Sequence, residues 1–182
     1  MAFTKYLQST WRDHSNNSSL KSRIIGWRRS LSVVRVDNPE RLDRARRLGY
    51  KAKNGYILAR VRLIRGGRQR PLIKKGRRSR ARRRLKIISK PYQQIAEERA
   101  ARKFKNCEVL NSYEIAKDGK FAWFEVILLD RSIVKNYSNM EWVSKERGRV
   151  FRGKTSAGKR GRGLRNKGRG AEKIRPSLKA KR

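Results

Sequence analysis

Acidic residues are scarce in this chain, although it is rich in charge. It has 14 Asp and Glu residues against 52 Lys and Arg in 182 residues, a formal net charge of +38 at pH 7. Because a compact fold with that charge would repel itself, we expect a polyanionic partner. Arginine outnumbers lysine by 32 to 20. Since guanidinium groups pair bidentately with phosphate and stack on bases, the composition favours nucleic acid.

Cysteine and histidine are almost absent. The single cysteine, Cys107, cannot form a disulfide within the chain, and with the single histidine, His14, it cannot assemble a zinc-binding set. We therefore expect a reducing compartment, no metal and no cofactor. Cys107 is predicted to be a small, partly buried residue beside a strand, and His14 to be solvated.

Long apolar runs are missing as well. The longest uninterrupted aliphatic run is Val126 to Leu129, and no basic amphipathic helix with a broad apolar face appears, so a membrane surface is a poor candidate partner. The first residues lack the apolar stretch of a signal peptide, and we expect the protein to stay in the cytoplasm. Hydrophobic residues make up 36% of the chain, enough for one modest core.

The basic charge is segregated along the chain. No Asp or Glu occurs from Arg44 to Ala96, a stretch with twenty Lys and Arg, and residues 147–182 hold fifteen basic residues and one acidic one. Both stretches lack aromatic residues where they are most basic, so they offer no stacking ladder for single-stranded bases. The contacts that this pattern predicts are with phosphate and sugar.

The remaining segments have patterns typical of helices and strands. Apolar residues every three or four positions indicate one helix near residues 3–11 and another near 20–31, with Trp27 in the core. Residues 31–39 are typical of a short strand, and residues 39–50 of a helix with Pro39 near its first position.

Residues 56–67 alternate between apolar and polar side chains and predict a strand. Its arginines, Arg60 and Arg62, would make one face basic, and its other face would be apolar. That apolar face would consist of Ile57, Ala59, Val61 and Leu63.

Residues 68–86 have no usable apolar period, so we predict a long loop or an extended arm that orders only against its partner. Residues 90–104 are helical by propensity, with an i,i+4 pair between Glu98 and Arg102 on the surface. Glu97 and Glu98 are adjacent and cannot share a metal or a proton, so we interpret them as surface residues and not as a nuclease site.

Residues 108–130 contain two strand-like runs joined around Asp118-Gly119, which predicts a β-hairpin at the centre of the core. The predicted inward faces are Val109, Tyr113 and Ile115 on the first strand, and Ala122, Phe124, Val126 and Leu128 on the second.

This order of elements predicts an α+β fold with a largely antiparallel sheet. We divide the chain into an N-terminal helical segment (1–31), an α+β domain (32–149) with a basic arm at about 66–90, and a C-terminal tail (150–182). The tail is rich in Gly, Arg and Lys and is predicted to be extended.

One motif in the tail suggests a different activity. Gly153, four intervening residues and then Gly158-Lys159 are one residue short of a phosphate-binding loop. Position 160 is Arg, so the hydroxyl that would bind magnesium is missing, and no buried strand precedes the loop. The glycines that follow argue against the helix that such a loop should enter. A nucleotide hydrolase therefore stays an alternative that the motif supports poorly.

Several segments resemble a known family. These are PERLDRARRLGYKAKNGYILARV (39–61), IAEERAARKF (95–104), VLNSY (109–113), FEVILLD (124–130) and VFRGKTSAGKRGRGL (150–164). They are similar to large-subunit ribosomal protein fifteen of the archaeal and eukaryotic type, the L15e family, and GRGAEKIRPSLKAKR (168–182) resembles its archaeal form. The resemblance implies a structural, non-enzymatic constituent of the large ribosomal subunit. Its partners would be ribosomal RNA and neighbouring ribosomal proteins, and its location would be the cytoplasm.

The candidate RNA-binding residues are the cations of the arm and the tail. In the arm they are Arg68, Arg70, Lys74, Lys75, Arg77, Arg78, Arg80, Arg82, Arg83 and Arg84; in the tail they are Arg152, Lys154, Lys159, Arg160, Arg162, Arg165, Lys167 and Arg169. Narrow basic arms suit folded RNA, because they can thread between its helices. A DNA-packaging protein would carry the same charge and is kept as the alternative.

Overall fold

A four-stranded antiparallel sheet forms the centre of the protein. The computed structural model describes residues 2–12, 18–69, 76, 85–86 and 88–168. The strands lie in the order β1-β2-β6-β5, and every neighbouring pair is antiparallel. They are β1 (Val33–Val36), β2 (Tyr56–Ile64), β5 (Cys107–Lys117) and β6 (Phe121–Asp130). The predicted α+β fold is confirmed, and so is the hairpin of β5 and β6.

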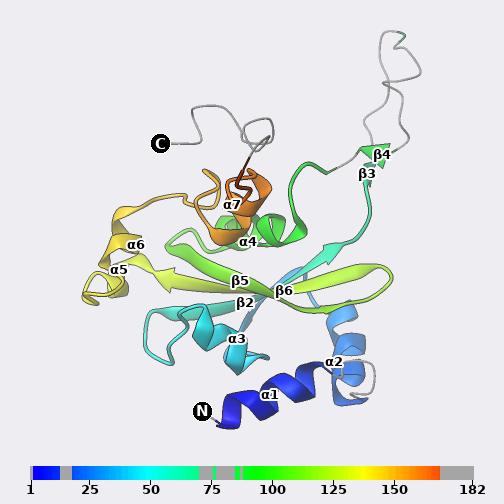
Figure 1. The fold of residues 1–182 in the computed structure, drawn as a ribbon, viewed down its shortest axis with the longest axis horizontal. Helices are drawn as coiled ribbons and strands as arrows, with labels where there is room; N and C mark the ends of the chain where they lie inside the picture. Colours follow the sequence, from blue (N-terminus) through cyan, green and yellow to red (C-terminus); the bar gives the residue numbers. More distant parts are fainter. Residues whose placement is uncertain (1, 13–17, 70–75, 77–84, 87, 169–182) are drawn as a thin grey trace.

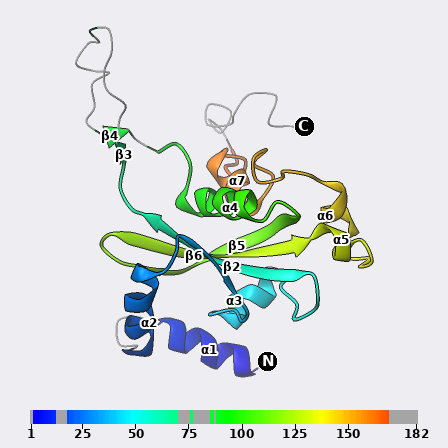
Figure 2. The same cartoon turned by 180° about the vertical axis from the view of Figure 1, so that it is seen from behind.

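Helices cover both faces of this sheet (Figures 1 and 2). One face carries α4 (Tyr92–Lys103) and α7 (Ser156–Gly161), and the other carries α1 (Ala2–Arg12), α2 (Ser18–Arg29) and α3 (Leu42–Arg47). Two short helices, α5 (Arg131–Val134) and α6 (Glu141–Lys145), follow the end of β6. At the opposite end of the sheet, β3 (Arg68–Gln69) and β4 (Leu85–Lys86) pair at the base of the arm.

Each face of the sheet has its own apolar cluster. On the α4 side, alternate residues of β2 and β6, among them Val61 and Val126, pack with Ala96 and Ala100. On the other side, Trp123 and Ile127 pack with Trp27 of α2, which is only 6% exposed. The predicted inward faces of β2 and β6, and the predicted burial of Trp27, are therefore confirmed.

The predicted face of β5 is wrong. Val109 packs in the cluster on the α4 side, whereas Tyr113 and Ile115 pack in the cluster on the α2 side. The pairing of β5 with β6 shifts register between Val109 and Asn111 and again between Glu114 and Ala116. Because a β-bulge inserts one residue, it moves the following side chains to the other face, and simple alternation cannot anticipate it.

The helix predicted from Pro39 begins later, at Leu42. The backbone N–H of Glu40 donates to the carboxylate of Glu125 on β6, at 3.1 Å. The residues before α3 therefore make a tertiary contact with the sheet instead of starting the helix.

The expectation of an extended chain after Phe151 is also wrong for residues 156–161, which form α7. Thr155 caps the helix, since its hydroxyl accepts the N–H of Gly158 at 3.2 Å. A Cβ on Gly158 would lie 2.6 Å from Cα of Gly153, and one on Gly161 would lie 2.7 Å from Oε1 of Gln94 in α4. These glycines permit close packing of α7, a use of glycine that composition alone cannot distinguish from chain flexibility.

Candidate nucleic-acid interface

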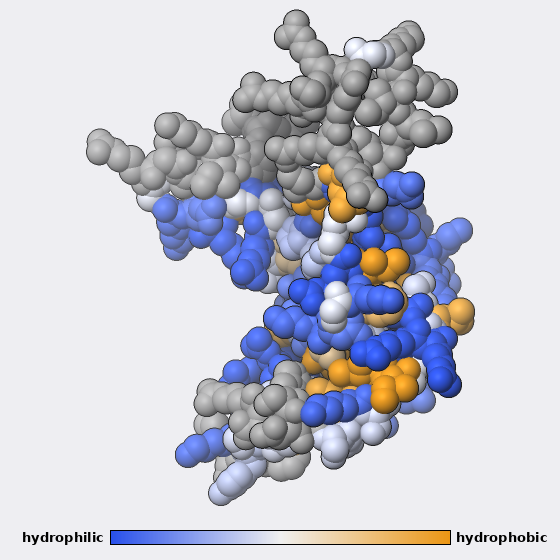
Figure 3. All heavy atoms as spheres, turned by 90° about the vertical axis from the view of Figure 1, so that its right-hand side faces the viewer, coloured by the Kyte–Doolittle hydropathy of each residue, from blue (hydrophilic) through white to orange (hydrophobic). Residues whose placement is uncertain are grey.

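Most acidic side chains are buried or engaged within the protein. Five are buried, namely Asp43, Glu97, Glu98, Glu108 and Glu125. Among the described acidic residues, the exposed ones are Asp37, Glu114 and Glu141. The scarce negative charge is therefore largely withdrawn from the surface. Seen from the side of the arm, the described surface is mostly hydrophilic, with a few apolar patches (Figure 3).

Glu97 joins three elements inside the protein. Its carboxylate accepts the hydroxyl of Ser112 on β5 and the hydroxyl of Thr155 before α7, both at 2.5 Å. Burial raises the pKa of Glu97, and the two hydroxyl bonds oppose that shift. The interpretation of Glu97 and Glu98 as surface residues is wrong, because they are 0% and 5% exposed. The ion pair of Glu98 with Arg102 is present at 3.7 Å.

Glu125 is a second buried carboxylate on the opposite face of the sheet. It accepts hydrogen bonds from the hydroxyl of Tyr113 and from the N–H of Glu40. Burial raises the pKa of Glu125 to about 7, although both bonds favour the ionised form. The pKa of Tyr113 is raised by burial and by the negative charge of Glu125.

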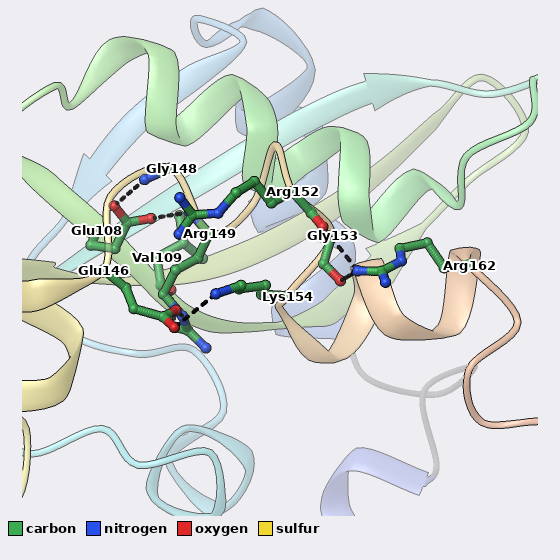
Figure 4. Close-up of polar contacts among 9 residues, drawn as sticks. All are labelled: Glu108, Val109, Glu146, Gly148, Arg149, Arg152, Gly153, Lys154 and Arg162. Carbon is green, nitrogen blue, oxygen red and sulfur yellow. Dashed lines mark hydrogen bonds and ion pairs between the residues drawn. The ribbon is translucent and has the colours of Figure 1, made fainter. Parts of the chain in front are cut away.

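Hydrogen bonds hold the segment before α7 in a defined path (Figure 4). Glu108 of β5 accepts the N–H groups of Gly148, at 2.9 Å, and Arg149, at 3.0 Å. The guanidinium of Arg149, which is 7% exposed, donates to the carbonyl of Val109 and to Glu146. This buried arginine positions the start of the tail against β5.

The structure separates the predicted tail residues into two groups. Lys154 pairs with Glu146 at 3.0 Å, and Arg162 donates to the carbonyls of Arg152 and Gly153 (Figure 4). These two cations are partly buried and contribute to the fold. The other described members are exposed, namely Arg152, Lys159, Arg160, Arg165 and Lys167. Arg165 also donates to the hydroxyl of Ser156.

In the arm, Arg68 is the predicted residue that the structure describes, and it lies on β3, partly buried. The other predicted arm residues lie outside the described residues, and so do Arg169 of the tail and His14. These arm residues are Arg70, Lys74, Lys75, Arg77, Arg78, Arg80, Arg82, Arg83 and Arg84. The base of the arm is tied to α4, because the hydroxyl of Tyr92 accepts the N–H of Gly66 at 2.7 Å.

Two arginines of α4, Arg99 and Arg102, were not among the predicted RNA-binding residues. Burial lowers the pKa of Arg99, and the positive charges of Arg68 and Arg102 lower it further. Arg99 and Arg102 are three residues apart and so share one side of the helix. This i,i+3 spacing in a predicted helix is the sequence signal that could have identified the pair. Arg102 pairs with Glu98, whereas Arg99 makes no ion pair with a described residue.

The predicted basic face of β2 has a structural use. The guanidinium of Arg60 lies 4.6 Å from the ring centre of Trp27, and that of Arg62 lies 4.8 Å from that of Phe121. These cation–π contacts bury part of each arginine between the sheet and its neighbours.

The near-match to a phosphate-binding loop does not form a phosphate cradle. Gly158, whose N–H would face phosphate, donates to Thr155 and packs against Gly153. Lys159 lies on the exposed side of α7. Among the described residues, no group of three His, Cys, Asp or Glu side chains could hold a metal, and no helix is long and apolar enough to cross a membrane.

Cys107 was predicted to be partly buried beside a strand; it is buried and is the first residue of β5. Burial, followed by the nearby charge of Asp130, raises the pKa of its thiol to about 11. The thiol is therefore neutral at physiological pH and a weak nucleophile.

The fold and the distribution of charge define a strongly basic α+β protein with exposed cations. Compared with known proteins, the chain matches the family described as Ribosomal L15 over residues 2–181. The large ribosomal subunit protein eL15 of Methanocorpusculum labreanum is 49% identical over 179 residues, which cover 95% of this chain and 92% of that protein. The corresponding protein of Methanospirillum hungatei is 48% identical over 183 residues, covering 96% and 93%.

The chain therefore belongs to the ribosomal protein L15 family of the eL15 type, a family of structural proteins and not of enzymes. This confirms the resemblance found in the sequence. It gives no support to DNA packaging or to nucleotide hydrolysis.

Proposed function

We propose that this chain binds and stabilises folded large-subunit ribosomal RNA through phosphate contacts of its basic arm and tail. Membership of the eL15 type makes it a structural constituent of the large ribosomal subunit, which works in the cytoplasm. Ribosomal RNA and neighbouring ribosomal proteins are then its partners.

One observation carries the proposal about phosphate. Five of the described acidic side chains are buried, whereas the tail cations Lys159, Arg160 and Lys167 are exposed and make no ion pair with a described residue. Such cations bind phosphate by releasing the counterions condensed on RNA. The proposal includes the division of the chain into residues 1–31, 32–149 and 150–182. It also includes the predicted RNA-binding residues of the arm and the tail. Within that set, we now assign Lys154 and Arg162 mainly to the fold.

Sedimentation of a cell lysate through a sucrose gradient in high salt tests the proposal. The chain is followed by immunoblot. In high salt it should migrate with the large subunit, and after ribonuclease treatment it should no longer be found in that fraction. Recovery in nuclease-sensitive chromosomal material instead would overturn the proposal and favour DNA packaging.

A further inference from the structure

A cationic cavity of about 530 Å³ lies on the α4 side of the sheet, away from the arm. The end of α4 contributes Arg102, the connection to β5 contributes Lys105, β5 contributes Cys107, and α5 contributes Arg131. Arg147 and Phe151 complete the lining from the segment that leads to α7. Cavities of roughly 300–1,000 Å³ are of the size that holds a small organic group.

Three cations of this cavity have no carboxylate partner in the described part of the chain, although Arg131 donates to the carbonyl of Ser144 at 3.4 Å and Arg102 pairs with Glu98. Lys105, Arg131 and Arg147 make no ion pair with any residue that the structure describes. The Nε atom of Arg131 is buried without a hydrogen-bond partner. The one carboxylate in the lining, Glu108, is already bound to the N–H groups of Gly148 and Arg149. The cavity therefore retains a positive charge that an anion would neutralise.

An aromatic ring stands at the edge of the same cavity. Phe151 is 51% exposed, and the guanidinium of Arg102 lies 5.7 Å from its ring centre. The backbone of Phe151 is held in a turn, because its N–H donates to the carbonyl of Gly148 at 3.1 Å. Exposed aromatic rings and guanidinium planes are the surfaces on which unstacked bases stack.

We propose that this cavity receives one unstacked nucleotide of large-subunit ribosomal RNA, with its base on Phe151 and its phosphate on Arg147 and Lys105. A flat apolar surface beside cations matches a nucleotide, which joins a planar base to an anion. The neutral thiol of Cys107 supplies an apolar wall and no reactive group. This inference rests on the proposed function and adds a base contact to binding that otherwise depends on phosphate.

The test is 2′-hydroxyl acylation of assembled large subunits, which reports the mobility of each nucleotide. Subunits carrying the wild-type chain, Phe151→Ala, Phe151→Tyr or Tyr6→Ala are compared. One unpaired nucleotide should be protected in the wild type and react at least about fivefold more in Phe151→Ala, the population change expected from losing one stack. Phe151→Tyr keeps a ring, and Tyr6→Ala removes an exposed ring elsewhere, so both should leave that nucleotide protected.

A second measurement covers the case in which Phe151→Ala is not incorporated. Photocrosslinking from Phe151→p-benzoylphenylalanine should then label an unpaired ribosomal nucleotide. Label on a protein, or an unchanged acylation pattern in incorporated Phe151→Ala, would overturn the nucleotide assignment and leave the proposed function intact. Absence of the wild-type chain from the large subunit would instead refute the proposed function.

Discussion

The carboxylate of Glu97 in α4 accepts a hydrogen bond of 2.5 Å from the hydroxyl of Thr155, 58 residues later in the chain. The same hydroxyl accepts the N–H of Gly158 and so caps α7. One side chain thus joins the tail to the sheet domain and begins the last described helix. These two hydrogen bonds tie the start of α7 to α4.

Thr155→Ala should destabilise the protein by about 2 kcal/mol. The substitution removes a helix cap and leaves the buried carboxylate of Glu97 without one of its two donors. Urea unfolding followed by circular dichroism measures the loss. Thr155→Ser keeps the hydroxyl and should recover most of it; equal losses for both substitutions would show that the hydrogen bonds are not the cause.

Gly158→Ala should cost about 1–3 kcal/mol of unfolding free energy, because its methyl group would lie 2.6 Å from the backbone of Gly153. The matched control is Gly26→Ala in α2, where no atom lies within 4 Å of the added Cβ. That control should be neutral or stabilise the helix by about 0.5–1 kcal/mol. Thermal unfolding of both variants distinguishes close packing from helix propensity, and a stable Gly158→Ala protein would refute the packing role.

Stability should fall as the pH rises from about 4.5 to about 7. The folded pKa of Glu125 is about 7, above its usual value of 4.5, so the folded state binds the extra proton in this range. The stabilisation from this group is complete below the unfolded pKa and is lost as the pH passes the folded pKa, on the order of 3 kcal/mol. Glu125→Gln cannot titrate and should lack this slope.

Urea midpoints from pH 5 to pH 8 measure the difference between wild type and Glu125→Gln. The control Glu114→Gln changes an exposed carboxylate on β5 and should follow the wild type. Parallel curves for wild type and Glu125→Gln would contradict the assigned titration.

Lys159→Ala combined with Arg160→Ala should weaken the salt dependence of RNA binding. Each lost phosphate contact lowers the log–log slope by about 0.7–0.9, so the double variant should lose about 1.4–1.8. Filter binding to a large-subunit ribosomal RNA transcript over a range of salt concentrations gives the slope. Lys154→Met, which breaks the ion pair with Glu146, should change stability more than slope. An unchanged slope in the double variant would remove these cations from the interface.

Deletion of residues 68–84 should prevent stable incorporation into the large subunit, because it removes the arm cations that we assign to ribosomal RNA. A sucrose gradient in high salt, with the deleted chain followed by immunoblot, measures incorporation. Replacing the same residues with a neutral Gly/Ser segment of equal length separates lost charge from lost length. Normal incorporation of the deleted chain would disprove the role of the arm.

The sequence by itself determined the fold class, the helices and strands with strong periodicity, and the family. The alternation in β2 and β6 and the turn at Asp118-Gly119 are local signals, and local backbone geometry is enough to read them. The net charge of +38 likewise predicted a polyanionic partner without any coordinates.

Only the tertiary structure decided which charges face outward. Glu97 resembled a surface residue until the fold placed Ser112 and Thr155 beside it, and Lys154 resembled a phosphate ligand until Glu146 was found at 3.0 Å. The bulges of β5 and the close approach at Gly158 depend on partners distant in sequence. Burial and pairing of this kind depend on contacts between distant segments, and a local sequence pattern does not show which distant segments meet.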